Sequence, residues 1–187
     1  MTSMWTIAGR LTVHPVADRP DLIATPVADA FATLEPTDRD RCCVAEIDPD
    51  LADTAAFCET YGSPLSASAN CVVVAGKREG VERYAACLVL ATTRADVNGV
   101  VRRRLDVRKA SFAPMDDAVA RTGMAYGGIT PFGLPAEWPL LIDKAVAALP
   151  ELVVGSGVRR SKLLVPGDVL AGLPSAEVID GLGRPVG

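Results

Sequence analysis

The spacing between apolar residues changes several times along the chain, from the alternation of strands to the three- or four-residue spacing of helices. Short apolar or alternating runs, bounded by Gly, Pro or Asp, predict strands at residues 4–13, 42–48, 139–143, 151–157 and 162–168. Two longer apolar runs, residues 70–76 and 83–92, flank the polar turn of residues 76–80. This arrangement is typical of a β-hairpin.

Other segments have the pattern of helices. We expect helices within residues 21–34, starting near Pro26, at 51–62, ending at Gly62, at 96–107 despite Gly99, and at 115–123, with acids in its first turn. Strands and helices mix without a regular βαβ rhythm, so the predicted class is α+β. With 187 residues, one compact domain spanning residues 1–187 is expected.

Composition narrows the class of protein. Hydrophobic residues make up 49% and charged residues 22% of the chain, which is typical of a globular protein. No apolar run approaches the roughly 18 residues of a membrane span, and the first residues lack the pattern of a secretory signal. We therefore expect a cytoplasmic protein with no membrane partner.

Cysteine and histidine usage excludes several chemistries. The five cysteines are odd in number and contain no CxxC spacing, so neither a disulfide framework nor a zinc knuckle is expected. His14 is the sole histidine, which excludes a histidine-rich metal site and leaves a nucleophile–histidine–acid triad only that residue to use. Cys71 can be a nucleophile or a buried core thiol, and the absence of a second histidine favours the core. We predict no metal and no cofactor.

One loop carries unusual backbone restriction. The segment MAYGGITPFGLPAEWPLLID, residues 124–143, holds two adjacent glycines and several prolines before an apolar run that ends in an acid. Glycine admits backbone angles closed to other residues, whereas proline fixes its own and removes an amide donor. A loop held in one shape, with accessible amides, is suited to contact with a ligand.

The order of motifs from Ser66 to about Leu182 resembles the YbaK/EbsC family, the free-standing relatives of the editing domain inserted in bacterial prolyl-tRNA synthetase. The resemblance is carried by RTGMAYGGITPFGLP (121–135), PLLID (139–143), VVGSGVRR (153–160) and LLVPGDVL (163–170). Residues 1–50 match less well and are expected to belong to the same domain.

The resemblance implies a central mixed, barrel-like sheet flanked by helices, and an activity that hydrolyses amino acids from wrongly charged tRNA. It implies the acceptor end of an aminoacyl-tRNA as partner, with an aminoacyl-tRNA synthetase as a further candidate. Two positions depart from the family pattern. The lysine at the start of the strand is replaced by Ala69 or Asn70, and the closing glycine of the later turn is Arg160.

Ester hydrolysis passes through an oxyanion that backbone amides can stabilise, so Gly127 and Gly128 are candidate catalytic residues, or else a simple turn. Thr130 is a candidate hydrogen-bonding group in the pocket or the cap of a bend. Asn70 can hold the carbonyl or the α-amine, or form a strand-edge turn. The vicinal ribose hydroxyl of the substrate can relay a proton, which is how the family is thought to work.

Further residues are candidates for substrate binding. Asp143 can bind the α-ammonium group or serve as a helix N-cap. The basic run of residues 102–109 is a candidate for phosphate contact, joined by Arg159, Arg160 and Lys162, although a solvated helix face explains the run equally well. The net charge of −4 favours local contact with an acceptor end over broad duplex binding. The complete set expected at the substrate is Pro131, Asp143, Gly155, Ser156, Gly157, Arg159 and Arg160.

Three functions stay open at this point. The first is a trans-editing aminoacyl-tRNA deacylase. The second is a catalytically silent relative that binds an aminoacyl or amino-acid-like ligand or a protein partner, which the missing lysine favours. The third is a small-molecule esterase that uses the same pocket.

Overall fold

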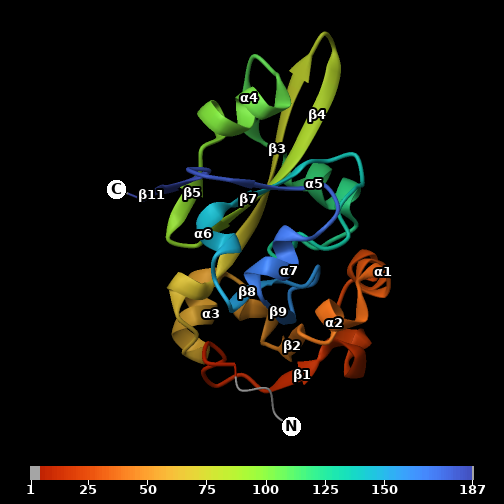
Figure 1. Cartoon of the computed structure of the whole chain (residues 1–187), viewed down its shortest axis with the longest axis vertical. Coiled ribbons are helices and arrows are strands. Elements are labelled where there is room, and N and C mark those ends of the chain that lie inside the picture. Colours follow the sequence, from red (N-terminus) through yellow and green to blue (C-terminus); the bar gives the residue numbers. More distant parts are fainter. Residues whose placement is uncertain (1–4, 187) are drawn as a thin grey trace.

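The strands of the computed structural model, which describes residues 5–186, form two main sheets and a two-stranded ribbon (Figure 1). The strands are β1 (Val13–Pro15), β2 (Cys43–Glu46), β3 (Ala69–Arg78), β4 (Val81–Leu90), β5 (Thr93–Ala95), β6 (Ala110–Phe112), β7 (Leu140–Asp143), β8 (Leu152–Gly155), β9 (Ser161–Val165), β10 (Ala176–Ile179) and β11 (Gly183–Pro185). The helices are α1 (Thr25–Thr33), α2 (Pro36–Arg39), α3 (Thr54–Tyr61), α4 (Arg102–Leu105), α5 (Met115–Thr122), α6 (Lys144–Ala147) and α7 (Gly167–Ala171).

The larger sheet has the strand order β10-β7-β4-β3-β6 and is mixed. Strand β7 runs parallel to both β4 and β10, whereas β3 is antiparallel to β4 and β6. The second sheet, β1-β2-β9-β8, is antiparallel throughout. The predicted α+β class and mixed sheet are confirmed.

The two sheets meet where Ser68, just before β3, bridges to Val153 of β8. Side chains from both sheets, including Val44, Leu88, Ile142 and Leu163, join one buried cluster with Phe132. Because apolar surface from both sheets is removed from water together, the residues before β3 and the end of β8 are held side by side. This junction positions the cleft described below.

The hairpin β3–β4 pairs ten residues of each strand, from Ala69 with Leu90 to Arg78 with Val81. Its turn consists of Glu79 and Gly80, both with positive φ (51° and 79°), as a two-residue hairpin turn of the primed type requires. The predicted hairpin is confirmed, with a longer first strand and a tighter turn than expected. Figure 1 shows the hairpin extending to one end of the molecule, beside α4.

The predicted helices are present. Helix α1 begins next to Pro26 and buries Val27 and Phe31, which are one turn apart. Gly62 and Gly123 end α3 and α5 in the left-handed conformation. The expected helix at 96–107 is irregular: a π-helical turn at Val97–Val101 precedes the short α4. None of the helices within residues 5–186 has the length and apolarity needed to cross a bilayer.

The strand expected at residues 4–13 is wrong over the part that the structure describes, and Met4 lies outside that part. Residues 5–12 form turns, and β1 begins only at Val13. Gly9 adopts a φ of +55°, and Arg10 donates its amide to the carbonyl of Tyr61 (2.7 Å) rather than to a neighbouring strand. The apolar side chain of Ile7 still packs into a buried cluster around Phe57, so the apolar pattern reflected burial and not an extended chain.

Candidate functional site

A cleft of about 710 Å³ opens at the junction of the two sheets. Its walls come from the start of α3, the first residues of β3, the loop after α5 and the end of β8. Of the residues predicted for the site, Asn70, Gly127, Gly155 and Arg159 line this cleft. The structure therefore brings together four residues that are spread over 90 positions of the sequence.

Asn70, the second residue of β3, lines the cleft beside Ala69, and one of these two positions is where the family pattern has lysine. Its amide oxygen accepts a 2.8 Å hydrogen bond from the hydroxyl of Thr54, at the start of α3. Because the oxygen is engaged, the two N–H donors of the Asn70 amide are left for the cleft. Within residues 5–186 they have no hydrogen-bond acceptor.

Gly127 and Gly128 occupy different environments. Gly127 is exposed in the cleft with a φ of +85°, and its amide donates to no acceptor within the described residues. Gly128 is buried, and its amide donates to the Ala125 carbonyl (2.9 Å). A backbone N–H stabilises an oxyanion only when it is free to point at it. Gly127 is therefore the available donor, whereas Gly128 holds the turn together.

Gly128 also takes part in a set of backbone contacts, called the backbone seam here, that joins residues 125–128 of the loop to the β8–β9 turn. Its carbonyl accepts from the Gly157 amide (2.6 Å), and the Gly157 carbonyl accepts from Ala125 (2.9 Å). A Cβ at Gly128 would lie 2.6 Å from the Val158 carbonyl oxygen, and one at Gly155 would lie 2.6 Å from the Gly128 carbonyl oxygen. Only glycine permits this approach. The seam fixes the loop against β8 and thereby shapes the cleft.

Ser156 and Gly157 lie behind the cleft wall. The buried Ser156 hydroxyl lies 3.1 Å from the carbonyl oxygens of both Val158 and Ser161, between which its single proton is shared, and it accepts a hydrogen bond from the Ser161 hydroxyl (2.7 Å). Gly157 has a φ of +87° and packs against Ala24. Both residues hold the shape of the β8–β9 turn.

The two arginines of this turn diverge. The Arg159 guanidinium lies over Gly127, bonded to the carbonyls of Tyr126 (3.2 Å) and Pro49 (3.1 Å), and lines the cleft. Arg160 instead donates to the Asp21 carbonyl and does not line the cleft. Only Arg159 is placed to meet a ligand there.

Thr130, Pro131 and Asp143 lie outside the cleft lining. Thr130 is fully buried, and its hydroxyl has no hydrogen-bond partner within the described residues. Asp143 ends β7 and occupies the N-cap position of α6, although its side chain makes no capping hydrogen bond. Its carboxylate lies near Gly183 of the β5–β11 ribbon. It is kept away from the cleft because β4 lies between β7 and β3, the strand that begins in the cleft.

Lys162, which the sequence groups with Arg159 and Arg160 as a candidate for phosphate contact, lines the cleft. It lies on β9, paired with Gly155 of β8, and only 7% of its surface is exposed. Its ammonium donates to the Ala52 carbonyl (2.8 Å), lies 5.4 Å from the centre of the Phe57 ring and forms no ion pair within residues 5–186. The pKa of Lys162 is lowered from 10.5 to about 8, chiefly because burial disfavours the charged form, with a smaller contribution from the charge of Arg159.

Three other cleft residues were not predicted from the sequence. Asp53, at the N-cap of α3, is the one carboxylate among the described lining residues. Phe112 and Tyr126 line the cleft and remain 59% and 55% exposed. Large aromatic side chains exposed together beside a cleft offer surfaces on which planar groups can stack.

Cys71 lines the cleft but is a poor nucleophile. Burial raises the pKa of its thiol, so the reactive thiolate is scarce at neutral pH. Burial likewise raises the pKa of Cys87 to about 12, and all five cysteines are free. His14 lies on β1, outside the cleft lining. Within residues 5–186, no group of three or more His, Cys, Asp or Glu side chains is arranged to hold a metal ion.

The sequence matches the family model of the aminoacyl-tRNA editing domain over residues 48–173, more than half of its length. The chain belongs to this family. The match includes α3, β3, the glycine loop and β9, which are the elements that build the cleft. The resemblance stated from the sequence motifs is thereby confirmed. No curated protein matches the sequence.

Solved structures of editing-domain members and related folds are similar to this chain. One, provisionally assigned as a trans-editing enzyme for prolyl-tRNA synthetase, has a TM-score of 0.69 at 20% identity and covers 87% of this chain and 99% of its own. Another, a scaffold for epitope backbone grafting by computational design, has a TM-score of 0.70 at 22% identity. The match covers 86% of this chain and 97% of the scaffold. At these identities the likeness concerns the fold alone.

Proposed function

We propose that the protein is a trans-editing aminoacyl-tRNA deacylase, which hydrolyses the ester between an amino acid and the terminal ribose of a mischarged tRNA. Membership of the editing-domain family supports this reaction class. The observation that carries the proposal is the Gly127 amide, exposed in the cleft with no protein acceptor. This donor is what an ester hydrolase without a histidine base needs at its reaction centre.

In the proposed reaction, water attacks the acyl carbon, and the carbonyl oxygen takes up the negative charge beside the Gly127 amide. Collapse of this intermediate breaks the bond to the ribose oxygen, which accepts a proton. The neighbouring ribose hydroxyl relays that proton from the attacking water, so the enzyme needs no titrating base. The sole histidine, His14, lies outside the cleft lining, which is consistent with such substrate assistance.

The other cleft residues have roles that suit the parts of this substrate. The carboxylate of Asp53 binds the α-ammonium group of the amino acid, a role expected from the sequence for Asp143, which lies outside the cleft. The N–H donors of Asn70 bind a polar atom of the acyl group. Phe112 and Tyr126 stack on the terminal base, and Arg159 contacts a phosphate of the acceptor end.

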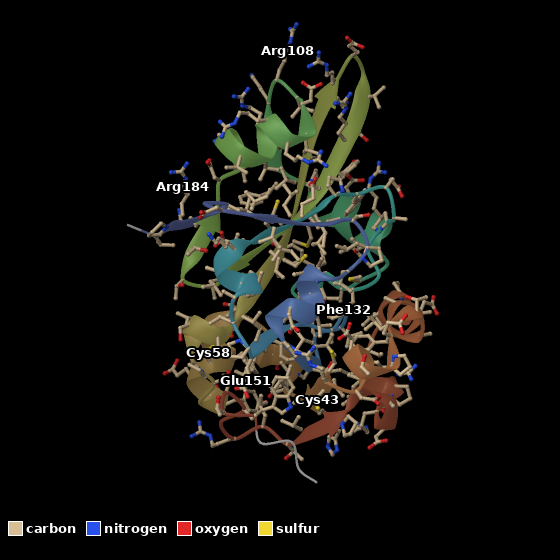
Figure 2. All side chains as sticks on the ribbon, in the orientation of Figure 1. Cys43, Cys58, Arg108, Phe132, Glu151 and Arg184 are labelled. Carbon is tan, nitrogen blue, oxygen red and sulfur yellow. The ribbon has the colours of Figure 1, made fainter. Side chains whose placement is uncertain are left out.

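The basic run predicted from the sequence suits the more distant part of the tRNA. Arg103 of α4 and Arg108 carry no ion pair among the described residues, whereas Arg104 is paired with Glu177. Figure 2 shows Arg108 at the hairpin end of the molecule, projecting away from the body. Under the proposal, these free arginines contact the phosphate backbone beyond the acceptor end.

A panel of mischarged tRNAs tests the proposed function. The protein is expected to release the amino acid from at least one of them faster than the spontaneous rate, and Gly127→Val, which fills the space beside the amide, serves as the inactive control. Thermal stabilisation by aminoacyl ligands without turnover would contradict the deacylase and favour the binding function. Hydrolysis of simple esters but of no charged tRNA would favour the small-molecule esterase.

A further inference from the structure

The cleft contains a buried lysine that the proposed mechanism does not use. Lys162 comes from β9, not from the start of β3 where the family pattern has its lysine, and the sequence suggests for it only phosphate contact beside Arg159 and Arg160. Lys162 lines the cleft together with Asn70 and Gly127. Burying a lysine side chain is costly, and buried charges are ordinarily paired.

The protein satisfies this ammonium only in part. An ammonium has three N–H donors, and the described residues accept one hydrogen bond from it, at the Ala52 carbonyl. The Phe57 ring lies on another side, at 5.4 Å. The charged or titratable groups that face Lys162 are Asp53 and Cys58 of the α3 segment and Arg159 of the turn before β9, and none of them forms an ion pair with it. The remaining donors are therefore available to a ligand in the cleft.

Backbone pairing places Lys162 beside the strand against which the loop of the candidate oxyanion donor packs. Lys162 is the register partner of Gly155, and a Cβ at Gly155 would lie 2.6 and 2.7 Å from the carbonyl oxygens of Gly128 and Ile129. The loop that carries Gly127 thus packs directly on the strand that neighbours Lys162. A cation and a backbone amide that converge on one cleft are the two kinds of group that stabilise an oxyanion.

We infer that Lys162 is a catalytic residue whose ammonium contacts the carbonyl oxygen of the bound acyl group, and so supplies from β9 the positive charge that the start of β3 lacks. This inference rests on the proposed deacylase function. Water forms the new bond to the acyl carbon, the electron pair of the carbonyl moves onto its oxygen, and the bond to the ribose oxygen then breaks as that oxygen takes the proton lost by the water. Lys162 keeps its proton throughout.

The competing explanation is purely structural, with Lys162 tying β9 to the start of α3 through the Ala52 carbonyl. Two substitutions separate the explanations. Lys162→Gln keeps a donor for Ala52 but removes the charge, whereas Lys162→Met removes both. If the charge is catalytic, both variants lose about 100-fold in kcat with little change in KM. A structural role predicts that Lys162→Gln keeps the activity of the parent, and that result would overturn the inference.

The pH profile gives a second readout. The protonated ammonium is the active form, so the kcat of the parent should fall as the pH rises through about 8, where burial places the pKa of Lys162. Titration of the substrate amine is common to all variants. The profile of Lys162→Gln should therefore lack the falling limb that is particular to the parent. A limb of equal size in both proteins would count against Lys162.

A binding measurement separates failure of this inference from failure of the proposed function. The chain has four lysines, so labelling with lysine carrying ¹³C at the ε position gives few resonances, and Lys162→Gln assigns one of them. A non-hydrolysable 3′-amide analogue of aminoacyl-adenosine keeps the carbonyl and should shift the Lys162 resonance. If the protein hydrolyses no charged tRNA, the deacylase proposal fails, yet a shifted resonance still supports carbonyl contact. An unchanged resonance at saturating analogue overturns the inference in either case.

Discussion

The hydroxyl of Thr54 donates a 2.8 Å hydrogen bond to the amide oxygen of Asn70, joining the first turn of α3 to the second residue of β3. The bond sets which end of the Asn70 amide faces the cleft. With the oxygen held by Thr54, the nitrogen presents its donors to a ligand. Asn70 is thus oriented as a hydrogen-bond donor, as the lysine of the family pattern would be.

Loss of this donor should weaken catalysis. We expect Asn70→Ala to cost about 1–3 kcal/mol in transition-state stabilisation, measured from kcat/KM on the best mischarged tRNA. Thr54→Val, which leaves the amide in place but unoriented, should cost less. If Asn70→Ala turns over every charged tRNA as fast as the parent does, Asn70 has no role in catalysis and is only part of the strand.

The adjacent glycines should respond differently to substitution. Gly128→Ala forces a Cβ against the Val158 backbone and should destabilise the fold by about 1–3 kcal/mol, measured by denaturant unfolding. At Gly127 a Cβ meets the end of the flexible Arg159 side chain, although its φ of +85° disfavours alanine. Gly127→Ala should therefore reduce turnover more than Gly128→Ala does at equal folded fraction. If Gly128→Ala instead loses more turnover than Gly127→Ala, the Gly127 amide does not take part in the reaction.

Arg159 and Arg160 provide a matched pair for testing phosphate contact. Arg159 lines the cleft, whereas Arg160 is bonded to the Asp21 carbonyl away from it. Arg159→Ala should raise the KM for charged tRNA and reduce the slope of log KM against log salt by about 0.7–0.9, the effect of one lost phosphate contact. Arg160→Ala should leave the slope unchanged. Equal slopes for parent and Arg159→Ala would make Arg159 a structural residue that covers Gly127.

The buried ammonium of Lys162 should reduce stability at neutral pH. The pKa of Lys162 falls from 10.5 to about 8 on folding, so between these values the unfolded chain binds more protons and the stability of the parent rises with pH. Lys162→Met lacks this dependence. It should be more stable than the parent below about pH 8, by up to about 3 kcal/mol, and the difference should vanish near pH 10.5. Urea unfolding across this range measures it, and a constant difference would refute the assignment.

The basic end of the hairpin should contribute to tRNA binding but not to chemistry. Replacing both Arg103 and Arg108 by alanine should weaken binding and reduce the salt slope by up to about 1.5, with kcat unchanged at saturation. Arg39→Ala, in α2 near the opposite end of the molecule, is the control. If the double variant and the control bind tRNA equally well, the run at residues 102–109 is a solvated helix face.

The sequence was sufficient for most elements and for the loop side of the cleft. Glycines, prolines and apolar runs act locally, so α1, the hairpin and the positions of Gly127 and Gly155 could be read from neighbouring residues. Residues 5–12 were wrongly predicted as part of a strand. Their apolar side chains are needed for burial against Phe57, although the backbone turns at Gly9.

The rest of the site depends on how distant strands pair. Asp143 ends a strand, as predicted, but β4 lies between that strand and β3, so its carboxylate is remote from the cleft. Lys162 enters the cleft because β9 pairs with β8 in a register that sets it opposite Gly155. No local pattern encodes strand order or register between segments this far apart, so neither placement could be derived from the chain alone.

The hairpin fixes the distance between the cleft and the basic end of the molecule. Strand β3 begins in the cleft at Ala69 and ends at Arg78, so its ten residues separate the reaction centre from the basic end by about 30 Å. A free aminoacyl ester can fill the cleft but cannot reach the far arginines at the same time. Only a substrate with phosphates held at that distance from its ester engages both ends. Under the proposed function, the length of the hairpin selects charged tRNA over small esters by size, without reading a base.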